Sequence, residues 1–221
     1  MHFIDIHTHQ IPAGTGKLFI MNRFPENHLT DLPPGGFFSI GLHPWFIGSN
    51  NAYRKQLQLL EEMLGREGVV AVGECGLDKA CQTDCQLQLD VFLRQCEIAE
   101  ALNKPVIIHS VRAWNDIFHL KRKFRPKVPW ILHGYNGNEL VTKQLIQQDL
   151  FFSFGNALLD EKSPARKSLV LVPVEKIFFE TDEDLSPVSA MYEAAAEILD
   201  IKTARLAERV EWNFRNVFVR E

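Results

Sequence analysis

The sequence of 221 residues contains no hydrophobic run that approaches the roughly 20 apolar residues of a membrane-spanning helix. It also lacks a secretory signal pattern, because Met1 runs directly into a short strand-like segment that ends in polar residues. Its four cysteines follow no common zinc spacing, although Cys81 and Cys85 could in principle share a zinc ion. Reduced thiols are the simpler interpretation. We therefore expect a cytoplasmic protein with no membrane partner and no obligate protein partner.

A strong net charge is absent as well. The sequence has 24 lysines and arginines against 28 aspartates and glutamates, so the formal net charge of −4 gives no general attraction for nucleic acid. A nucleic-acid ligand would have to be bound by a local patch. Residues 121–127 include five basic side chains that could contact phosphates. Because this cluster precedes a predicted strand, we interpret it as a solvated helix end.

No GxGxxG or Walker sequence is present, which removes the main reason to expect an open nucleotide-binding sheet. The sequence contains instead a series of short, nearly continuous apolar runs, typical of parallel strands covered by helices. Seven clear runs occupy residues 2–7, 37–43, 69–74, 105–109, 130–133, 150–154 and 176–182, and a weaker eighth occupies 17–22. Helical patterns occupy residues 51–66, 86–102, 113–123, 139–148, 163–171, 189–199 and 202–214.

This alternation of strands and helices predicts one α/β domain over residues 1–221, built as a TIM-type (β/α) barrel. One region is irregular. Residues 10–36 span only 27 positions, are rich in proline and glycine, and show no good helical period. We therefore expect the first helix to be missing or replaced by a loop, so that the barrel is incomplete or distorted in its first βα unit.

Several of the apolar runs end in a residue that can bind a cation. The motif DIHTH at residues 5–9 places two imidazoles on one side of a strand, because side chains alternate along a strand. Four further runs end in Glu74, His109, His133 and Asp182. In a parallel barrel all carboxyl ends of the strands meet at one face, where active sites form. One such histidine would more often be a satisfied core residue, but five such strand ends predict a metal centre.

The predicted donor set exceeds the needs of one tetrahedral site. Four histidines and two carboxylates suit two divalent cations with a carboxylate between them. Two cations roughly 3.5–4 Å apart can hold a bridging hydroxide and stabilise both the attacking and the leaving oxygen, which indicates hydrolysis. Mixed nitrogen and oxygen donors suit Zn, Mn, Ni or Fe more readily than Mg alone.

These motifs resemble the TatD-like deoxyribonuclease family of metal-dependent hydrolases, within the amidohydrolase superfamily. The resemblance runs through most of the chain and follows the order of the family. Beside DIHTH it rests on GLHPW at 41–45, GECGLD at 73–78, PVIIHSVRAW at 105–114, HGYNG at 133–137, FSFGN at 152–156, ETD at 180–182 and NFRNVF at 213–218. GECGLD and PVIIHS are the most specific of these signals.

The resemblance implies roles for the predicted ligands. It makes His7 and His9 ligands of a first metal and Glu74 the bridging carboxylate. It makes His109 and His133 ligands of the second metal.

The resemblance also makes Asp182 a metal-bound aspartate that takes the proton of the nucleophilic water, so that Asp182 and Glu74 are the expected catalytic residues. It implies that His43, in the GxHP element, contacts the substrate. Arg112 is expected either to contact a phosphate with its paired donors or to form a salt bridge with a neighbour. Two further acidic side chains are expected to orient the ligands, Asp78 and Glu180.

Two departures from the family concern the substrate rather than the metals. Typical members are longer, mostly between His9 and Phe37. They generally read HCFSG where this chain reads HGYNG, so Tyr135 and Asn136 alter the loop beside His133. The loops that follow barrel strands shape the pocket, and the substrate can therefore differ while the metal ligands are kept.

The resemblance and the donor set together predict a metal-dependent hydrolase that cleaves phosphodiester bonds in DNA. One alternative is a small-molecule amidohydrolase or lactonase that uses the same metal site. Another is a non-catalytic metal-binding scaffold, although such a protein would usually have lost a ligand. The opening FIDIHTHQIP also resembles the PHP phosphoesterase family. That family ends with an Asp-x-His ligand pair, which cannot form here because no histidine follows His133.

Overall fold

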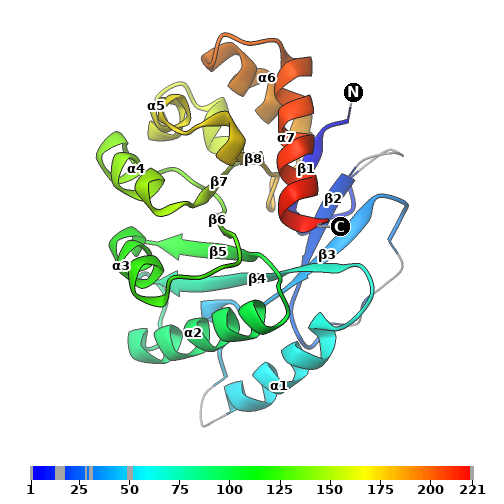
Figure 1. Cartoon of the computed structure of the whole chain (residues 1–221), viewed down its shortest axis with the longest axis vertical. Coiled ribbons are helices and arrows are strands. Elements are labelled where there is room, and N and C mark those ends of the chain that lie inside the picture. Colours follow the sequence, from blue (N-terminus) through cyan, green and yellow to red (C-terminus); the bar gives the residue numbers. More distant parts are fainter. Residues whose placement is uncertain (1, 13–17, 28, 30–31, 49–51, 220–221) are drawn as a thin grey trace.

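The structure, a computed structural model, describes residues 2–12, 18–27, 29, 32–48 and 52–219. Within these residues eight parallel strands form one sheet whose order follows the sequence, so the predicted TIM-type barrel is confirmed (Figure 1). The strands are β1 (Ile4–Thr8), β2 (Leu18–Arg23), β3 (Gly36–Ile40), β4 (Val69–Asp78), β5 (Val106–Val111), β6 (Trp130–Leu132), β7 (Phe151–Phe154) and β8 (Ile177–Phe179). All eight predicted runs therefore contain a strand, including the weak second one.

Helices follow the strands from β3 onward and lie outside them (Figure 1). They are α1 (Ala52–Leu64), α2 (Cys85–Ala101), α3 (Trp114–Phe124), α4 (Glu139–Leu145), α5 (Pro164–Leu171), α6 (Val188–Ile198) and α7 (Thr203–Phe218). Apolar side chains fill the layer between strands and helices, as where Phe92 of α2 packs edge-on against Trp130 of β6 with ring centroids 5.5 Å apart. Among the described helices, none combines the length and the apolar character that crossing a bilayer requires.

The first βα unit is irregular, as the sequence predicted. No described residue between β1 and β3 is helical. Helix α7 instead contacts β1 and β8, and its Phe214 packs against Phe37 of β3 with ring centroids 5.8 Å apart. The last helix thus covers part of the wall that helices after β1 and β2 would otherwise cover. Lys17 and Asn51, which open a predicted strand and a predicted helix, lie outside the described residues.

A short seam between β1 and the segment after β8 closes the barrel. The backbone N–H of Asp182 donates to the carbonyl of His7 at 2.9 Å, and the N–H of His9 donates to the carbonyl of Asp182 at 3.1 Å. The buried carboxylate of Asp5 adds a side-chain link, because it accepts hydrogen bonds from the backbone N–H of Thr181 at 3.1 Å and from its hydroxyl at 2.6 Å. The two ends of the sheet are thereby held together beside the predicted ligands.

Strand β4 is longer than the predicted run at residues 69–74, so Glu74 lies within the strand rather than at its end. The strand continues because β4 and β5 stay paired as far as Asp78 and Val111. Gly76 permits this pairing, since its φ of +153° and a Cβ position only 2.0 Å from the carbonyl oxygen of His109 leave no room for a side chain. The register between the two strands shifts just before Cys75, an irregularity of the kind that re-aims side chains near active sites.

Candidate metal centre

Glu74 lies at the centre of the predicted ligand set and is almost completely buried. Its Oε2 lies 3.5 Å from Nε2 of His7 and 3.9 Å from Nε2 of His9. Its Oε1 lies 2.7 Å from Nδ1 of His109 and 2.7 Å from Nε2 of His133. Each carboxylate oxygen therefore faces a different histidine pair, which is the arrangement expected of a carboxylate between two cation positions.

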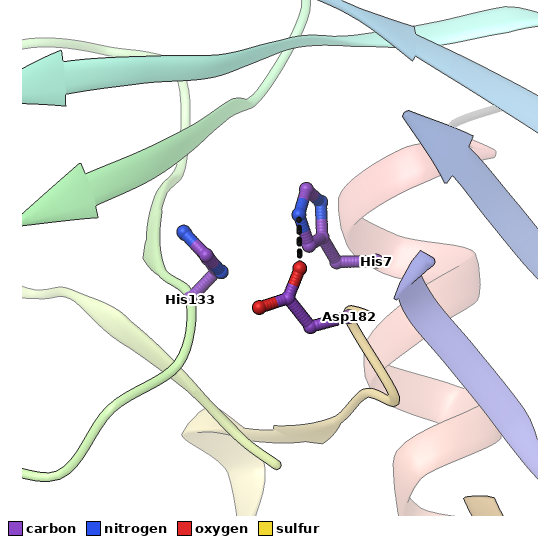
Figure 2. A group of neighbouring side chains, drawn as sticks. All are labelled: His7, His133 and Asp182. Atoms are coloured by element: carbon purple, nitrogen blue, oxygen red, sulfur yellow. Dashed lines mark ion pairs between the residues drawn. The ribbon is translucent and has the colours of Figure 1, made fainter. Parts of the chain in front are cut away.

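Asp182 faces the first histidine pair from the opposite side. Its Oδ1 lies 3.6 Å from Nε2 of His7 and 3.4 Å from Nε2 of His9. Figure 2 shows Asp182 pointing at His7, with the ring of His133 beside them and the centroids of the two rings 4.5 Å apart. The side chain of Asp182 is 44% exposed, whereas that of His7 is fully buried. Asp182 is thus more accessible to a water molecule or substrate than His7 or His9, whose side chain is 24% exposed.

The donor atoms around His7 fit a divalent cation in spacing. Around a tetrahedral zinc with bonds of about 2.0–2.1 Å, ligand atoms lie about 3.4 Å apart. The distances from His7 to both carboxylates and from His9 to Asp182 match this spacing and are wider than ordinary hydrogen bonds. The contacts of His109 and His133 with Glu74, both 2.7 Å, have the length of hydrogen bonds instead. Both ring nitrogens of the buried His7 have no hydrogen-bond partner, a costly arrangement that a bound cation would relieve.

Three groups of donors, each with its atoms within 4.8 Å of one another, occur among the described residues. They share members, and each contains at least one histidine and one carboxylate: His7, His133 and Asp182; His7, His9 and Glu74; His43, Glu74 and His109. All six predicted ligands are therefore brought together. None of the three groups contains a cysteine, and all four cysteines are free.

The acid and base groups of the cluster hold each other charged. Burial would raise the pKa of Glu74, but His133 and His109 keep it well below its usual range. Burial and the neighbouring His133 would lower the pKa of His7, but the close carboxylates of Asp182 and Glu74 raise it to about 9. In the metal-free protein the anionic Glu74 therefore lies beside the protonated ring of His7. A cation that binds here can replace the proton of His7.

The two residues expected to orient ligands are in place. Asp78 Oδ2 lies 3.2 Å from Nε2 of His109, on the side of the ring away from Glu74. Gln88 of α2 fixes the backbone of Asp78, since its side chain accepts from the Asp78 N–H at 2.7 Å and donates to the carbonyl at 3.0 Å. The fully buried Glu180 lies 3.3 Å from Nδ1 of His133. Both second-metal histidines thus have a carboxylate behind them, which sets ring orientation and tautomer.

The structure places His43, the expected substrate contact, within the donor cluster itself. Its Nε2 lies 3.3 Å from Oε1 of Glu74, and the side chain is nearly buried. The position is set by Gln95 of α2, which accepts from the N–H of Leu42 at 2.8 Å and donates to its carbonyl at 3.1 Å. Burial lowers the pKa of His43, so its ring is disposed to be neutral. His43 therefore has the position and the protonation state of a metal ligand as well as of a substrate contact.

Arg112 follows β5 with a left-handed φ of 54° and an exposed side chain. Among the described residues it has no ion-pair partner. The altered loop residues divide between two roles. Tyr135 is buried, and its hydroxyl lies 2.7 Å from Oγ1 of Thr142. Asn136 is exposed and helps to line a cavity of about 220 Å³ beside Asp182.

Sequence reasoning missed Asn22, at the end of β2. This buried side chain accepts a hydrogen bond from the backbone N–H of Glu74 at 2.7 Å and another from the hydroxyl of Ser39 at 3.3 Å. A signal was present, because Asn22 is the one amide in an otherwise apolar run. Asn22 was not recognised as part of the centre because its side chain carries no charge.

Comparison with known proteins agrees with this geometry. Residues 27–219 match the family described as TatD related DNase. YabD, a metal-dependent hydrolase of Bacillus subtilis, is 29% identical over 66% of this chain and 58% of its own length, so the chain spans little more than half of that relative. A protein of Escherichia fergusonii named 3'-5' ssDNA/RNA exonuclease TatD is 28% identical over 83% of this chain and 75% of its own length.

Among solved structures, the TatD homologue YjjV of Escherichia coli superposes with a TM-score of 0.84 over 99% of this chain and 98% of its own, at 20% identity. At that identity the likeness concerns the fold. The sequence match covers most of the chain, including every element from β3 to α7. The chain belongs to the TatD related DNase family.

Proposed function

We propose that this protein is a metal-dependent hydrolase that cleaves phosphodiester bonds in DNA, with two divalent cations held by His7, His9, Glu74, His109, His133 and Asp182. The observation that carries the proposal is the division of the two Glu74 oxygens between two histidine pairs. Two cations held in this way would supply a hydroxide at neutral pH and would offset the charge that develops on a phosphate.

The side chains around the centre would divide the remaining work. Glu74, being buried and anionic, sets the spacing between the two halves of the site. Asp182 is positioned to accept the proton of the attacking water, because its carboxylate is partly exposed while it contacts His7 and His9. Arg112 is free to pair with a phosphate oxygen of the substrate.

The choice of DNA rests on family and on local charge. A relative with 28% identity is named a 3'-5' ssDNA/RNA exonuclease, and nucleic acid is therefore the leading substrate class for this chain. The carboxyl ends of β2 and β5 each carry an arginine, Arg23 and Arg112, on the face of the barrel that holds the donor cluster. Such cations counter the repulsion that a carboxylate-rich centre would exert on a polyanion.

The test measures release of nucleotides from end-labelled single-stranded oligonucleotides with Mg²⁺, Mn²⁺ or Zn²⁺. We expect metal-dependent cleavage by the unaltered protein and a loss of at least about a hundredfold in His109→Ala and in Asp182→Asn, in line with removal of a group that acts in the transition state. His119→Ala and Asp90→Asn, exposed positions on α3 and α2, are the matched controls and should retain full activity. Cleavage that persists in both site variants, or no cleavage with any metal, overturns the proposal.

A small-molecule amide or lactone is a second candidate. The cavities beside the centre, of about 300 and 220 Å³, are at the lower end of the range for one small ligand. The same preparation should be assayed on amide and lactone substrates. Metal-dependent turnover of those compounds, without any cleavage of oligonucleotides, would move the assignment to this class.

A further inference from the structure

Three aromatic side chains border the metal centre along the β2 and β3 ends of the barrel. Phe24 follows β2, and its ring centroid lies 6.5 Å from that of His9. Phe46 packs edge-on against Phe24 at 4.8 Å. Trp45 reaches the other side of the centre, where its ring lies 6.3 Å from that of His109. These residues, here called the aromatic rim, run from one predicted cation position to the other.

Two of the three side chains in the aromatic rim are exposed to solvent although they are large and apolar. Trp45 is 59% and Phe46 is 50% accessible. Exposed apolar side chains that gather beside a site indicate a binding surface, whereas scattered ones do not. The fold therefore leaves these two rings uncovered next to the donor cluster.

The aromatic rim is also held rigidly. Trp45 donates from its indole Nε1 to Oδ2 of Asp78 at 2.6 Å, and its backbone N–H donates to Nδ1 of His43 at 3.1 Å. The backbone carbonyl of Phe46 accepts a hydrogen bond from Gln56 of α1 at 3.0 Å. A ligand that binds these rings would meet a preformed surface and would lose little affinity to ordering it.

Two unpaired cations accompany the aromatic rim. Arg23 lies directly before Phe24, and its guanidinium donates a hydrogen bond to the backbone carbonyl of Asn22 at 3.3 Å. Arg112 lies beyond His109. Within the part of the chain that the structure describes, neither guanidinium has an ion-pair partner. Exposed ring faces interleaved with free cations are the combination that single-stranded nucleic acids use, with bases on the rings and phosphates on the cations.

We propose that Trp45 and Phe46 stack against the base of the nucleotide whose phosphodiester lies at the metal centre, and that this stacking selects unpaired strands. The inference rests on the proposed function. Inside a duplex both faces of a base are covered by its neighbours, so the aromatic rim can receive an internal base only from a single strand. At an end, fraying frees both faces of the base and the phosphodiester beside it. Stacking tolerates every base because each has a π-face, so we expect little sequence preference.

The test compares oligonucleotides that differ only in the terminal residue, which carries either a base or an abasic sugar. We expect the unaltered protein to cleave the base-bearing end with a kcat/KM about tenfold or more higher, in line with stacking of one base. Phe46→Leu should remove most of that discrimination, chiefly through KM, and Phe46→Tyr should restore it. Trp212→Leu, which alters a 54% exposed aromatic on α7, is the matched control and should keep the discrimination.

Trp45→Phe provides a second reading, because it keeps a ring while it removes the hydrogen bond to Asp78. We expect this variant to keep the base-over-abasic ratio even where its metal affinity falls. Equal cleavage of both ends by the unaltered protein, or full discrimination in Phe46→Leu, overturns the inference while leaving phosphodiester hydrolysis intact. Absence of any metal-dependent cleavage contradicts the proposed function itself, so the two failures are distinguishable.

Discussion

The side-chain Oδ1 of Asn22 in β2 accepts a hydrogen bond of 2.7 Å from the backbone N–H of Glu74 in β4. This bond spans the intervening strand β3. The same Oδ1 accepts from Ser39 of β3 at 3.3 Å, so one amide oxygen ties three neighbouring strands together. All of these groups are buried. The position of the central carboxylate is therefore set by a side chain that carries no charge and is not one of the predicted ligands.

Replacing Asn22 should loosen both the barrel and the metal centre. We expect Asn22→Ala to lower the free energy of unfolding of the metal-free protein by about 1–3 kcal/mol, because the N–H of Glu74 is left buried without a partner. Denaturant unfolding in the presence of a chelator measures this change. Ser39→Ala removes only the longer bond to the same oxygen and should cost less. An Asn22→Ala variant as stable as the Ser39→Ala variant would contradict the role given to Asn22.

Metal binding should strengthen as the pH rises. The pKa of His7 in the metal-free fold is raised to about 9, above its ordinary 6.5, so its proton stabilises that fold fully below pH 6.5 and ceases to do so as the pH approaches 9. A cation must displace this proton, and the affinity for Mn²⁺ measured by calorimetry should therefore increase from pH 6 to pH 8.5 with release of protons to the buffer. His119→Ala should show the same slope. A constant affinity over this range would refute the prediction.

Asp78 should control metal affinity without touching the cation. Its carboxylate lies behind the ring of His109, and we expect Asp78→Asn to weaken metal binding by about 10- to 100-fold, as with other carboxylates behind a ligand histidine. Equilibrium dialysis against Zn²⁺ would measure the loss. Asp116→Asn, which breaks the nearby ion pair with Lys79 instead, is the matched control and should bind metal as the unaltered protein does. Equal losses in both variants would show that general surface charge is responsible.

The Tyr135 hydroxyl should matter for stability and not for cleavage. Thr142 links it to the hydroxyl of Ser168, at 2.7 and 2.9 Å respectively, inside the helix layer. Thr142→Val keeps the shape but leaves the buried Tyr135 hydroxyl without a partner, whereas Ser168 keeps its bond to the carbonyl of Gly137 at 2.6 Å. We therefore expect a loss of about 1–3 kcal/mol in unfolding free energy with unchanged kcat per folded molecule. The double variant with Tyr135→Phe should lose less than the sum of the single changes. Strict additivity would mean that the two side chains do not interact.

The strands and helices could be predicted because local patterns determine them. Apolar runs bounded by polar residues mark buried parallel strands, and even the weak run that holds Met21 became β2. The meeting of the six predicted ligands at one face could be predicted because carboxyl ends of parallel strands share a face, whatever the details of each strand. These inferences need no knowledge of distant contacts.

The finer geometry could not be predicted, because it depends on register between strands. The shift between Val72 and Cys75 decides where Glu74 points, and a period of two along one strand does not reveal it. Likewise the shift between Asp5 and Thr8 leaves His7 and His9 at the centre while Asp5 bonds to Thr181 instead. The position of His43 beside Glu74 could not be predicted either, because it depends on the buried hydrogen bonds between Gln95 and Leu42, which lie 53 positions apart.

The seam at Asp5 and Thr181 joins residues 176 positions apart, and the first pair of histidines meets Asp182 immediately beside it. A ribosome has supplied every predicted donor once it has made residue 182, shortly before α6 (from Val188), and any nascent chain that ends earlier lacks Asp182. The donor set therefore depends on the whole path from β1 to β8 at once. Partial products of synthesis that end before Asp182 cannot assemble the complete centre.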